Sequence, residues 1–207
     1  MRPTLICTDL EGVFIPEIWI AVAEATGLAE LRLTTRDVKD YDELMAHRLK
    51  ILARENLTLP RIQQVIQSMP LLDGAEVFLK GLRAAYPLAI LSDTFYGFAG
   101  PFMARLGWPM LLCHTLVTDA EGRITGYTLR SRESKKNAVA SFQQQGYRVI
   151  AFGDSYNDTH MLAEADAGFL FHAPAQVKTD FPQYAAFEDY ADLASAVHAA
   201  AGAPTYF

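Results

Sequence analysis

The strongest constraint on the fold is an alternation of short apolar runs with longer amphipathic segments. The runs are TLICT, LAILS, MLLC, RVIAFG and AGFLF. Between them, apolar residues mostly recur at helical spacing. Short buried strands that alternate with helices are typical of a parallel sheet, because each parallel connection needs a long crossover. The sequence therefore predicts an α/β fold.

One stretch of the chain departs from this alternation. After the first apolar run, about 60 residues show helical periodicity without a convincing strand. An apolar stripe runs through 41–52, and Thr58 stands where it could cap a second helix. We expect residues 16–72 to form a small helical cap, inserted into a catalytic core made of residues 1–15 and 73–207.

Residues 114–129 carry the pattern of a β-hairpin. Side chains alternate in character on both sides of the turn-rich DAEG. We therefore expect one antiparallel pair of strands beside the parallel sheet.

Composition and charge exclude several classes of protein. With 207 residues and 51% hydrophobic content, the chain can bury a large core, which excludes disorder. A net charge of -6 gives no broad attraction to nucleic acid or to an anionic membrane. No run approaches the ~20 apolar residues that a bilayer requires, and the first residues do not read as a secretion signal. We expect a cytoplasmic protein in which Cys7 and Cys113 are buried and unpaired. The sequence leaves open whether the protein is a monomer or a homodimer.

Two acids, Asp9 and Glu11, follow directly after the first apolar run. A turn at Gly12 would present both above the carboxyl edge of the sheet, where open parallel sheets bind their ligands. The alternative is structural, because an acid at a strand end often caps the helix that follows.

A second acidic cluster favours the functional interpretation. Asp154 ends the run RVIAFG, and Asn157 and Asp158 open the next helix. Two strand ends that bring carboxylates to one edge repel each other unless a cation lies between them. Oxygen ligands without His or Cys beside them favour Mg²⁺.

A third strand end adds a hydroxyl group, and a helix start adds lysines. The run LAILSDTF ends in Ser92, Asp93 and Thr94, and Lys135 and Lys136 begin a later helix. Lysines at a helix N-terminus oppose the helix dipole, so we expect a bound anion to compensate them, although a solvated helix face is the alternative. Carboxylates, a hydroxyl, a lysine and a metal together suit phosphoryl transfer.

These motifs resemble a known family. The order DLEGV, LSDT, SKK and GDSYND is similar to the four motifs of the haloacid dehalogenase-like phosphatases, with the helical insertion at the cap position of the phosphoserine phosphatases. The stretches LEGVFIPEIWI, SDTFY and GDSYNDT are similar to the bifunctional members, which also transfer the phosphoryl group to homoserine. The resemblance implies a Rossmann-like three-layer α/β core, Mg²⁺, and phosphoserine and homoserine as substrates.

The resemblance also implies roles for single residues. Asp9 would be the nucleophile, and Glu11 would move protons to the leaving group and from the acceptor. Ser92 and Lys135 would hold the phosphoryl group, with Lys136 as the alternative lysine. Asp9, Asp154 and the main chain of Glu11 would hold Mg²⁺.

The remaining assignments concern substrate recognition. Glu17 would bind the substrate ammonium and Arg48 its carboxylate, whereas the alternatives are a first-turn acid and an exposed helix arginine. Asp93 and Asn157 would also contact substrate, and Asp158 would support the metal ligands. The histidines lack metal-like spacing and are expected to be packing or surface residues: His47, His114, His160, His172 and His198.

Two positions depart from the common family pattern. Glu11 is one methylene longer than the usual aspartate, which moves its carboxylate by up to roughly 1.5 Å and favours a larger alcohol over water as acceptor. Asp93 replaces a glycine that lets the main chain approach the phosphate. Both departures are also features of the bifunctional members that the chain resembles, and the resemblance therefore implies transfer as well as hydrolysis.

Three rival functions remain at this stage. A phospho-accepting receiver module uses similar residues but does not explain the helical insertion. A carbon–halogen hydrolase would not need the metal arrangement of Glu11 and Asp154. A phosphatase for another small phosphometabolite is the strongest rival, because only Glu17 and Arg48 indicate an amino acid.

Overall fold

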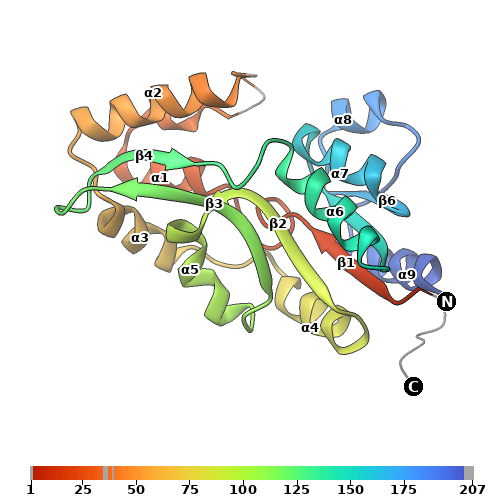
Figure 1. Cartoon of the computed structure of the whole chain (residues 1–207). Helices are drawn as coiled ribbons and strands as arrows, with labels where there is room; N and C mark the ends of the chain where they lie inside the picture. The colour runs from red at the N-terminus through yellow and green to blue at the C-terminus, as the bar shows by residue number, and fades with distance from the viewer. Residues whose placement is uncertain (1, 35–36, 39, 203–207) are drawn as a thin grey trace.

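The computed structural model describes residues 2–34, 37–38 and 40–202, and within them the chain forms one seven-stranded sheet (Figure 1). The strand order is β4-β3-β2-β1-β5-β6-β7. All neighbouring pairs are parallel except β3 and β4, which are antiparallel. The strands are β1 (Thr4–Thr8), β2 (Leu88–Phe95), β3 (Met110–Thr118), β4 (Ile124–Thr128), β5 (Arg148–Gly153), β6 (Ala167–Phe171) and β7 (Ala185–Phe187).

The α/β prediction is confirmed, and so are the five strands predicted from apolar runs and the hairpin of β3 with β4. The helices are α1 (Ile18–Thr26), α2 (Tyr41–Arg54), α3 (Leu59–Ser68), α4 (Ala75–Ala85), α5 (Tyr96–Arg105), α6 (Ser134–Gln144), α7 (Thr159–Glu164), α8 (Ala175–Asp180) and α9 (Tyr190–Ala201). Two 3₁₀ turns are η1 (Ala29–Arg32) and η2 (Tyr156–Asp158).

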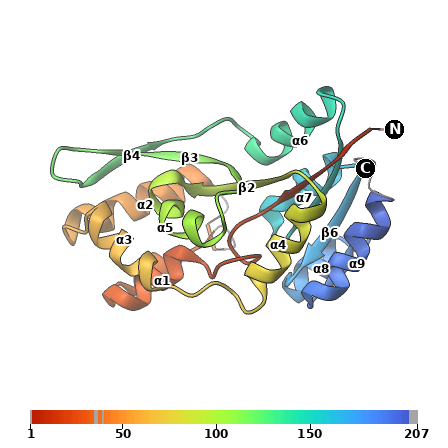
Figure 2. The same cartoon turned by 90° about the horizontal axis from the view of Figure 1, so that it is seen from below.

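Helices cover both faces of the sheet, because successive strand residues point to opposite sides. Ile6 of β1 packs into the same apolar cluster as residues of α4 and α9, whereas Leu5 and Cys7 pack with residues of α6, α7 and α8. Figure 2 shows α6 on one side of the sheet and α4 and α9 on the other. Cys7 and Cys113 are buried and unpaired, as predicted.

The helices α1, α2 and α3, with η1, lie to one side of the sheet beside the β3–β4 hairpin (Figure 1). Their buried side chains, Val22 and Ile62 among them, belong to the same apolar cluster as Ile90 and Phe152 of the sheet. The amide of Leu59 donates to a carbonyl oxygen of the hairpin turn at 2.9 Å. The cap region thus rests on the hairpin as well as on the sheet, and its division from the core at residues 16–72 stays a prediction.

Strand β2 carries a bulge at residues that were predicted for the site. In its pairing with β3, Leu91 lies opposite Leu112, but Phe95 lies opposite His114. Three residues of β2, at 92–94, therefore stand against one of β3. Bulges of this kind often turn side chains toward an active site.

Thr58 is the N-cap residue of α3, as predicted, although its side chain makes no capping hydrogen bond. Within the described residues, none of the helices combines the length and the apolar character that crossing a bilayer requires.

Candidate active site

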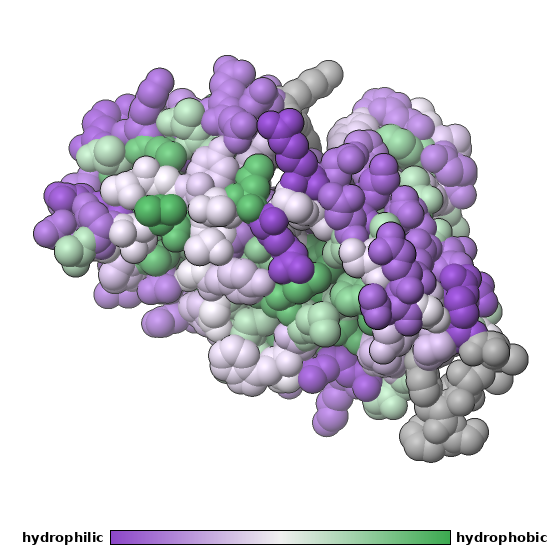
Figure 3. All heavy atoms as spheres, viewed as in Figure 1, coloured by the Kyte–Doolittle hydropathy of each residue, from purple (hydrophilic) through white to green (hydrophobic). Residues whose placement is uncertain are grey.

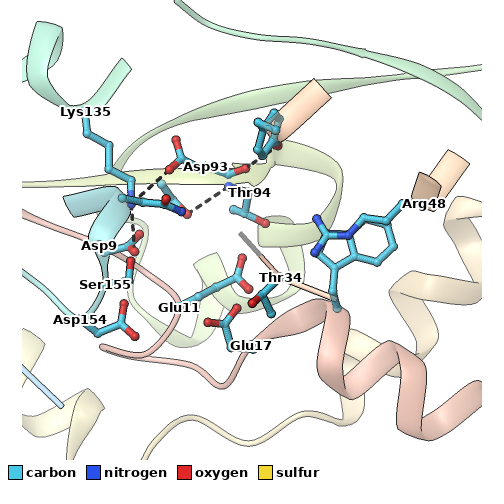
Figure 4. Close-up of a pocket in the computed structure, with 14 residues that line it drawn as sticks. Asp9, Glu11, Glu17, Thr34, Arg48, Asp93, Thr94, Lys135, Asp154 and Ser155 are labelled. Carbon is cyan, nitrogen blue, oxygen red and sulfur yellow. Dashed lines mark hydrogen bonds and ion pairs between the residues drawn. The ribbon is translucent and has the colours of Figure 1, made fainter. Parts of the chain in front are cut away.

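One cavity, at the carboxyl ends of β1, β2 and β5, collects nine of the side chains that the sequence predicted for the site, and Asp158 lies outside its lining (Figure 4). The predicted residues that line it are Asp9, Glu11, Glu17, Arg48, Ser92, Asp93, Lys135, Asp154 and Asn157. Sequence reasoning gave no site role to the other lining residues, which are Trp19, Thr34, Tyr41, Thr94 and Ser155. The roles of the predicted residues stay predictions, but their meeting in one cavity is an observation.

Lys135 is the buried cation at the centre of the acidic groups. Its Nζ lies 2.8 Å from Asp158 Oδ1, 3.0 Å from Asp9 Oδ2 and 3.5 Å from Asp93 Oδ2. Burial alone would lower the pKa of Lys135, but the three carboxylates outweigh burial and raise it well above its ordinary value. Lys136 points elsewhere: it is exposed and lies 4.0 Å from Glu133.

Asp9 is almost fully buried at the end of β1. Its Oδ1 accepts a hydrogen bond from the amide of Leu10 at 2.7 Å, so one oxygen is held by the main chain while the other faces Lys135. Burial raises the pKa of the Asp9 carboxyl well above its ordinary value; Lys135 opposes that shift and the neighbouring acids add to it. A cation between these acids would relieve the repulsion.

Asp158 is completely buried and both of its oxygens are engaged. Oδ1 accepts from Lys135, and Oδ2 accepts from the amides of Asp154 and Ser155 and from the Ser155 hydroxyl. Gly153 leaves room for this carboxylate, because a Cβ there would lie 2.3 Å from Asp158 Cγ. Asp158 therefore fixes the loop that follows β5.

The acids suit a hard divalent cation. Single oxygens of Asp9, Asp154 and Asp158 lie within 4.8 Å of one another. Asp158 Oδ2 already accepts three hydrogen bonds and Oδ1 faces Lys135, which leaves Asp158 little capacity to coordinate a cation directly. Among the described lining residues, five carboxyl side chains stand against two cations, so the cavity has the charge and the oxygen donors that Mg²⁺ prefers.

Gly12 makes this arrangement sterically possible. Its φ is +73°, and a Cβ on it would lie 2.5 Å from Cγ and Oδ2 of Asp154. The turn is closed by a hydrogen bond from the Gly12 amide to the Ile15 carbonyl at 2.8 Å. Only glycine combines this backbone angle with so close an approach.

Glu11 extends beyond Asp9 toward the cap. Its Oε2 accepts from the amide of Ile18, at the start of α1, at 2.8 Å. Burial raises the pKa of Glu11 to about 8, and the nearby Glu17 adds to the shift. A carboxyl group with such a pKa can both donate and accept a proton near neutral pH.

The bulge of β2 presents Ser92 and Asp93 to the cavity. The Ser92 hydroxyl is buried and accepts from the amide of Thr94 at 3.2 Å. Asp93 lies beside Lys135 and, unexpectedly, beside His114, whose Nε2 is 3.5 Å from Asp93 Oδ1. Although burial opposes its ionisation, Lys135 and His114 together lower the pKa of Asp93 to about 2. His114 is indeed a buried packing residue, but it also reaches the site.

Arg48, from α2, lies at the cap side of the cavity and is 6% exposed. Its guanidinium stacks on Trp19, with 4.5 Å from Cζ to the ring centroid, and donates to the Leu33 carbonyl at 2.8 Å. Its Nε is buried without a hydrogen-bond partner among the described residues. The exposed-arginine alternative is therefore wrong, and a guanidinium with an unused donor suits a planar anion.

A wider cleft adjoins this cavity between the start of α2 and the start of α6. It shares Tyr41, Asp93, Lys135 and Asn157 with the cavity. In Figure 3 the surface is hollowed between these two parts of the molecule, and the residues around the hollow are mostly hydrophilic. Small polar ligands can therefore enter from this side.

Comparison with known proteins gives a consistent set of relatives. Residues 5–166 match the model of a haloacid dehalogenase-like hydrolase family. The chain is 54% identical to the phosphoserine phosphatase ThrH of Pseudomonas aeruginosa, over 90% of this chain and 91% of the relative. It is 53% identical to a phosphoserine phosphatase of Pseudomonas syringae, over 90% of this chain and 79% of the relative.

Solved structures agree on the fold. A phosphoserine phosphatase determined as an analogue of its phospho-aspartyl intermediate matches with a TM-score of 0.78 at 18% identity, over 95% of this chain and 99% of that one. A substrate-bound phosphoserine phosphatase complex matches with a TM-score of 0.76, also at 18% identity, over 92% and 95%.

Proposed function

Because this chain belongs to the haloacid dehalogenase-like hydrolases, we propose that it is a Mg²⁺-dependent phosphoryl-transfer enzyme. It takes the phosphoryl group of phosphoserine onto Asp9 and passes it to water or to homoserine. One observation carries the proposal: the buried Asp9 and Lys135, 3.0 Å apart, share a small cavity with an under-bonded arginine. The cavity thus offers a phosphoryl site and an amino-acid site side by side.

The first chemical step forms a bond from a carboxylate oxygen of Asp9 to phosphorus and breaks the bond from phosphorus to the serine oxygen. Glu11 gives its proton to that departing oxygen, so that serine leaves as the alcohol. Lys135 and the hydroxyl of Ser92 stabilise the charge on the phosphoryl oxygens.

The second step breaks the acyl phosphate. The Glu11 carboxylate takes a proton from the acceptor hydroxyl while the acceptor oxygen bonds to phosphorus and the bond to Asp9 breaks. Water as acceptor yields phosphate, homoserine yields phosphohomoserine, and Asp9 returns to the carboxylate in both cases.

Magnesium would be held by Asp9, Asp154 and the main chain of Glu11, and when bound it would supply positive charge against the phosphoryl oxygens. Asp158 would orient this loop through its bonds to the amides of Asp154 and Ser155. The chain's own contribution is to hold these oxygens together against their repulsion.

Recognition of the amino acid would fall to the cap side of the cavity. Arg48 would take the substrate carboxylate in a bidentate pair, with the guanidinium oriented by Trp19. Glu17, at the N-cap position of α1, would take the ammonium. Asp93 and Asn157, which line the same cavity, would also contact the substrate.

Transfer to homoserine follows from the length of that acceptor and of Glu11. Homoserine carries the same ammonium and carboxylate as serine on an arm one methylene longer, so it can occupy the same contacts while its hydroxyl reaches the phosphoryl group. Bound in this way, it gains over water through proximity.

The experiment is phosphorus NMR of the protein with Mg²⁺ and phosphoserine, with and without homoserine. We expect phosphate alone in the first sample and phosphohomoserine in addition in the second. Phosphate release that homoserine does not alter would limit the protein to hydrolysis. A panel of other phosphometabolites, run in parallel, tests the remaining rival: faster turnover of a compound without an α-amino acid group would refute phosphoserine as the substrate.

A further inference from the structure

Asp93 is a carboxylate in a place where negative charge is unfavourable. It follows Ser92 on the bulge of β2 and lines the cavity in which a phosphoryl group is proposed to bind. A carboxylate there would repel that group and compete with it for Lys135, unless other residues hold it in one position.

Four residues from three elements, α6, β3 and α2, hold Asp93. Its Oδ1 lies 3.4 Å from the Ser134 hydroxyl and 3.5 Å from His114 Nε2. Its Oδ2 lies 3.5 Å from Lys135 Nζ, and its main-chain carbonyl accepts from the Tyr41 hydroxyl at 3.1 Å. The side chain is thus oriented toward α6 and β3.

His114 is the least expected of these partners, and its ring orientation is defined. The amide of Arg130 donates to His114 Nδ1 at 3.2 Å, so Nδ1 is an acceptor and the proton is on Nε2, which faces Asp93. The ring is 3% exposed and packs against Tyr41 and Phe95, with centroid distances of 6.1 and 6.2 Å. Packing and hydrogen bonding therefore fix the direction of the Nε2–H group.

The bulge explains why a residue of β3 can reach Asp93. His114 pairs with Phe95, directly after the three bulged residues, so its side chain lies next to the segment that the bulge displaces. An apolar side chain there would leave Asp93 Oδ1 with one donor fewer and the Arg130 amide without this acceptor.

We propose that His114 is a positioning residue for phosphoryl transfer, because its Nε2–H holds the Asp93 carboxylate against α6. Held there, Asp93 keeps Lys135 directed at Asp9, and its negative charge stays away from the phosphoryl group. The inference rests on the proposed function for the identity of the transferred group. It concerns the phosphoryl group alone, not the amino-acid part of the substrate.

The test compares His114→Leu, which loses the donor, with His114→Gln, whose side-chain amide retains one. We expect His114→Leu to lower kcat/KM about 10-fold on both phosphoserine and p-nitrophenyl phosphate, and His114→Gln to recover it to within about 3-fold of the wild type. His198→Leu is the control: the His198 ring also contacts a tyrosine ring, that of Tyr86 with centroids 5.5 Å apart, but His198 is exposed and lies outside the cavity, so activity should stay within about 2-fold.

A double-mutant cycle separates positioning from a packing role. In an Asp93→Gly background, His114→Leu should cause no further loss, because the group that His114 orients is gone. An equal loss in both backgrounds, or a His114→Gln variant as poor as His114→Leu, would show that the ring serves the fold and would overturn the inference.

Two readouts keep this test separate from the substrate proposal. If p-nitrophenyl phosphate is turned over and phosphoserine is not, the proposed substrate is wrong and the comparison of variants is made on p-nitrophenyl phosphate. NMR of wild-type protein labelled with ¹⁵N-histidine needs neither substrate nor variant. We expect the His114 signal of the Nε2–H tautomer, and a proton on Nδ1 alone would overturn the inference.

Discussion

Gly12→Ala should damage the proposed metal site more than it damages the fold. The substitution has two costs. At φ +73°, an alanine loses about 1–2 kcal/mol relative to glycine. Its Cβ would also lie 2.5 Å from Cγ and Oδ2 of Asp154, whereas carbon contacts are ordinarily about 3.5–4.0 Å, so the carboxylate has to move by about 1 Å.

A displacement of this size acts on a proposed ligand. Misplacement by about 1 Å can cost about 100-fold in rate, and disturbed support of a metal ligand about 10–100-fold in metal affinity. We therefore expect Gly12→Ala to need at least about 10-fold more Mg²⁺ for half-maximal turnover and to be about 100-fold slower at limiting Mg²⁺. The assay is phosphate release from phosphoserine across a Mg²⁺ titration, with thermal unfolding in parallel.

Gly27→Ala is the matched control. Gly27 has nearly the same backbone angle, φ +72°, but no atom lies within 4 Å of its added Cβ. It should lose the same strain energy, about 1–2 kcal/mol or about 2–8 °C in Tm, with an unchanged Mg²⁺ requirement. If the two variants show the same Mg²⁺ dependence, the contact between Gly12 and Asp154 does not support a metal site and the reasoning is refuted.

Three further predictions concern the substrate and the phosphoryl group. Arg48→Ala should lower kcat/KM for phosphoserine at least about 100-fold and change it less than about 3-fold for p-nitrophenyl phosphate; equal losses on both would assign Arg48 to the fold. Lys135→Met should lower phosphoserine turnover by about 1000-fold, because it leaves three carboxylates without their cation. Lys136→Met should lower turnover less than about 3-fold. A larger loss of turnover for Lys136→Met than for Lys135→Met would exchange the roles of the two lysines. Glu11→Asp, read by phosphorus NMR with homoserine present, should shift products toward free phosphate, and an unchanged product ratio would remove side-chain length as the cause of transfer.

The parts of the fold that the sequence predicted are those in which burial leaves a one-dimensional pattern. Strands buried on both faces appear as apolar runs, and the cap helices appear as stripes at helical spacing. β7 (Ala185–Phe187) was missed, because it has three residues, its two alanines are exposed and no alternation marks it. The bulge at 92–94 was also missed, since it depends on the register between two strands.

Residues of the candidate site also fall into those that a sequence pattern could predict and those that it could not. Asp9, Ser92 and Asp154 could be predicted to meet, because parallel strands bring their carboxyl ends to one edge of the sheet. The contact of His114 with Asp93 could not, since it depends on side-chain direction across neighbouring strands. Tyr41 was seen only as part of an apolar stripe, and its hydroxyl bond to the Asp93 carbonyl joins segments 52 residues apart.

The central claim is that Asp9 carries the phosphoryl group between donor and acceptor, and trapping that intermediate tests it most directly. The protein would be mixed with ³²P-phosphoserine and Mg²⁺, quenched in acid within one turnover, and its peptides analysed for an acyl phosphate that borohydride reduces. We predict label on Asp9, within the peptide that contains β1, and none in Asp9→Asn, which should fold normally without turning over substrate. Label on another residue such as Ser92, or substantial turnover by Asp9→Asn, would contradict this mechanism.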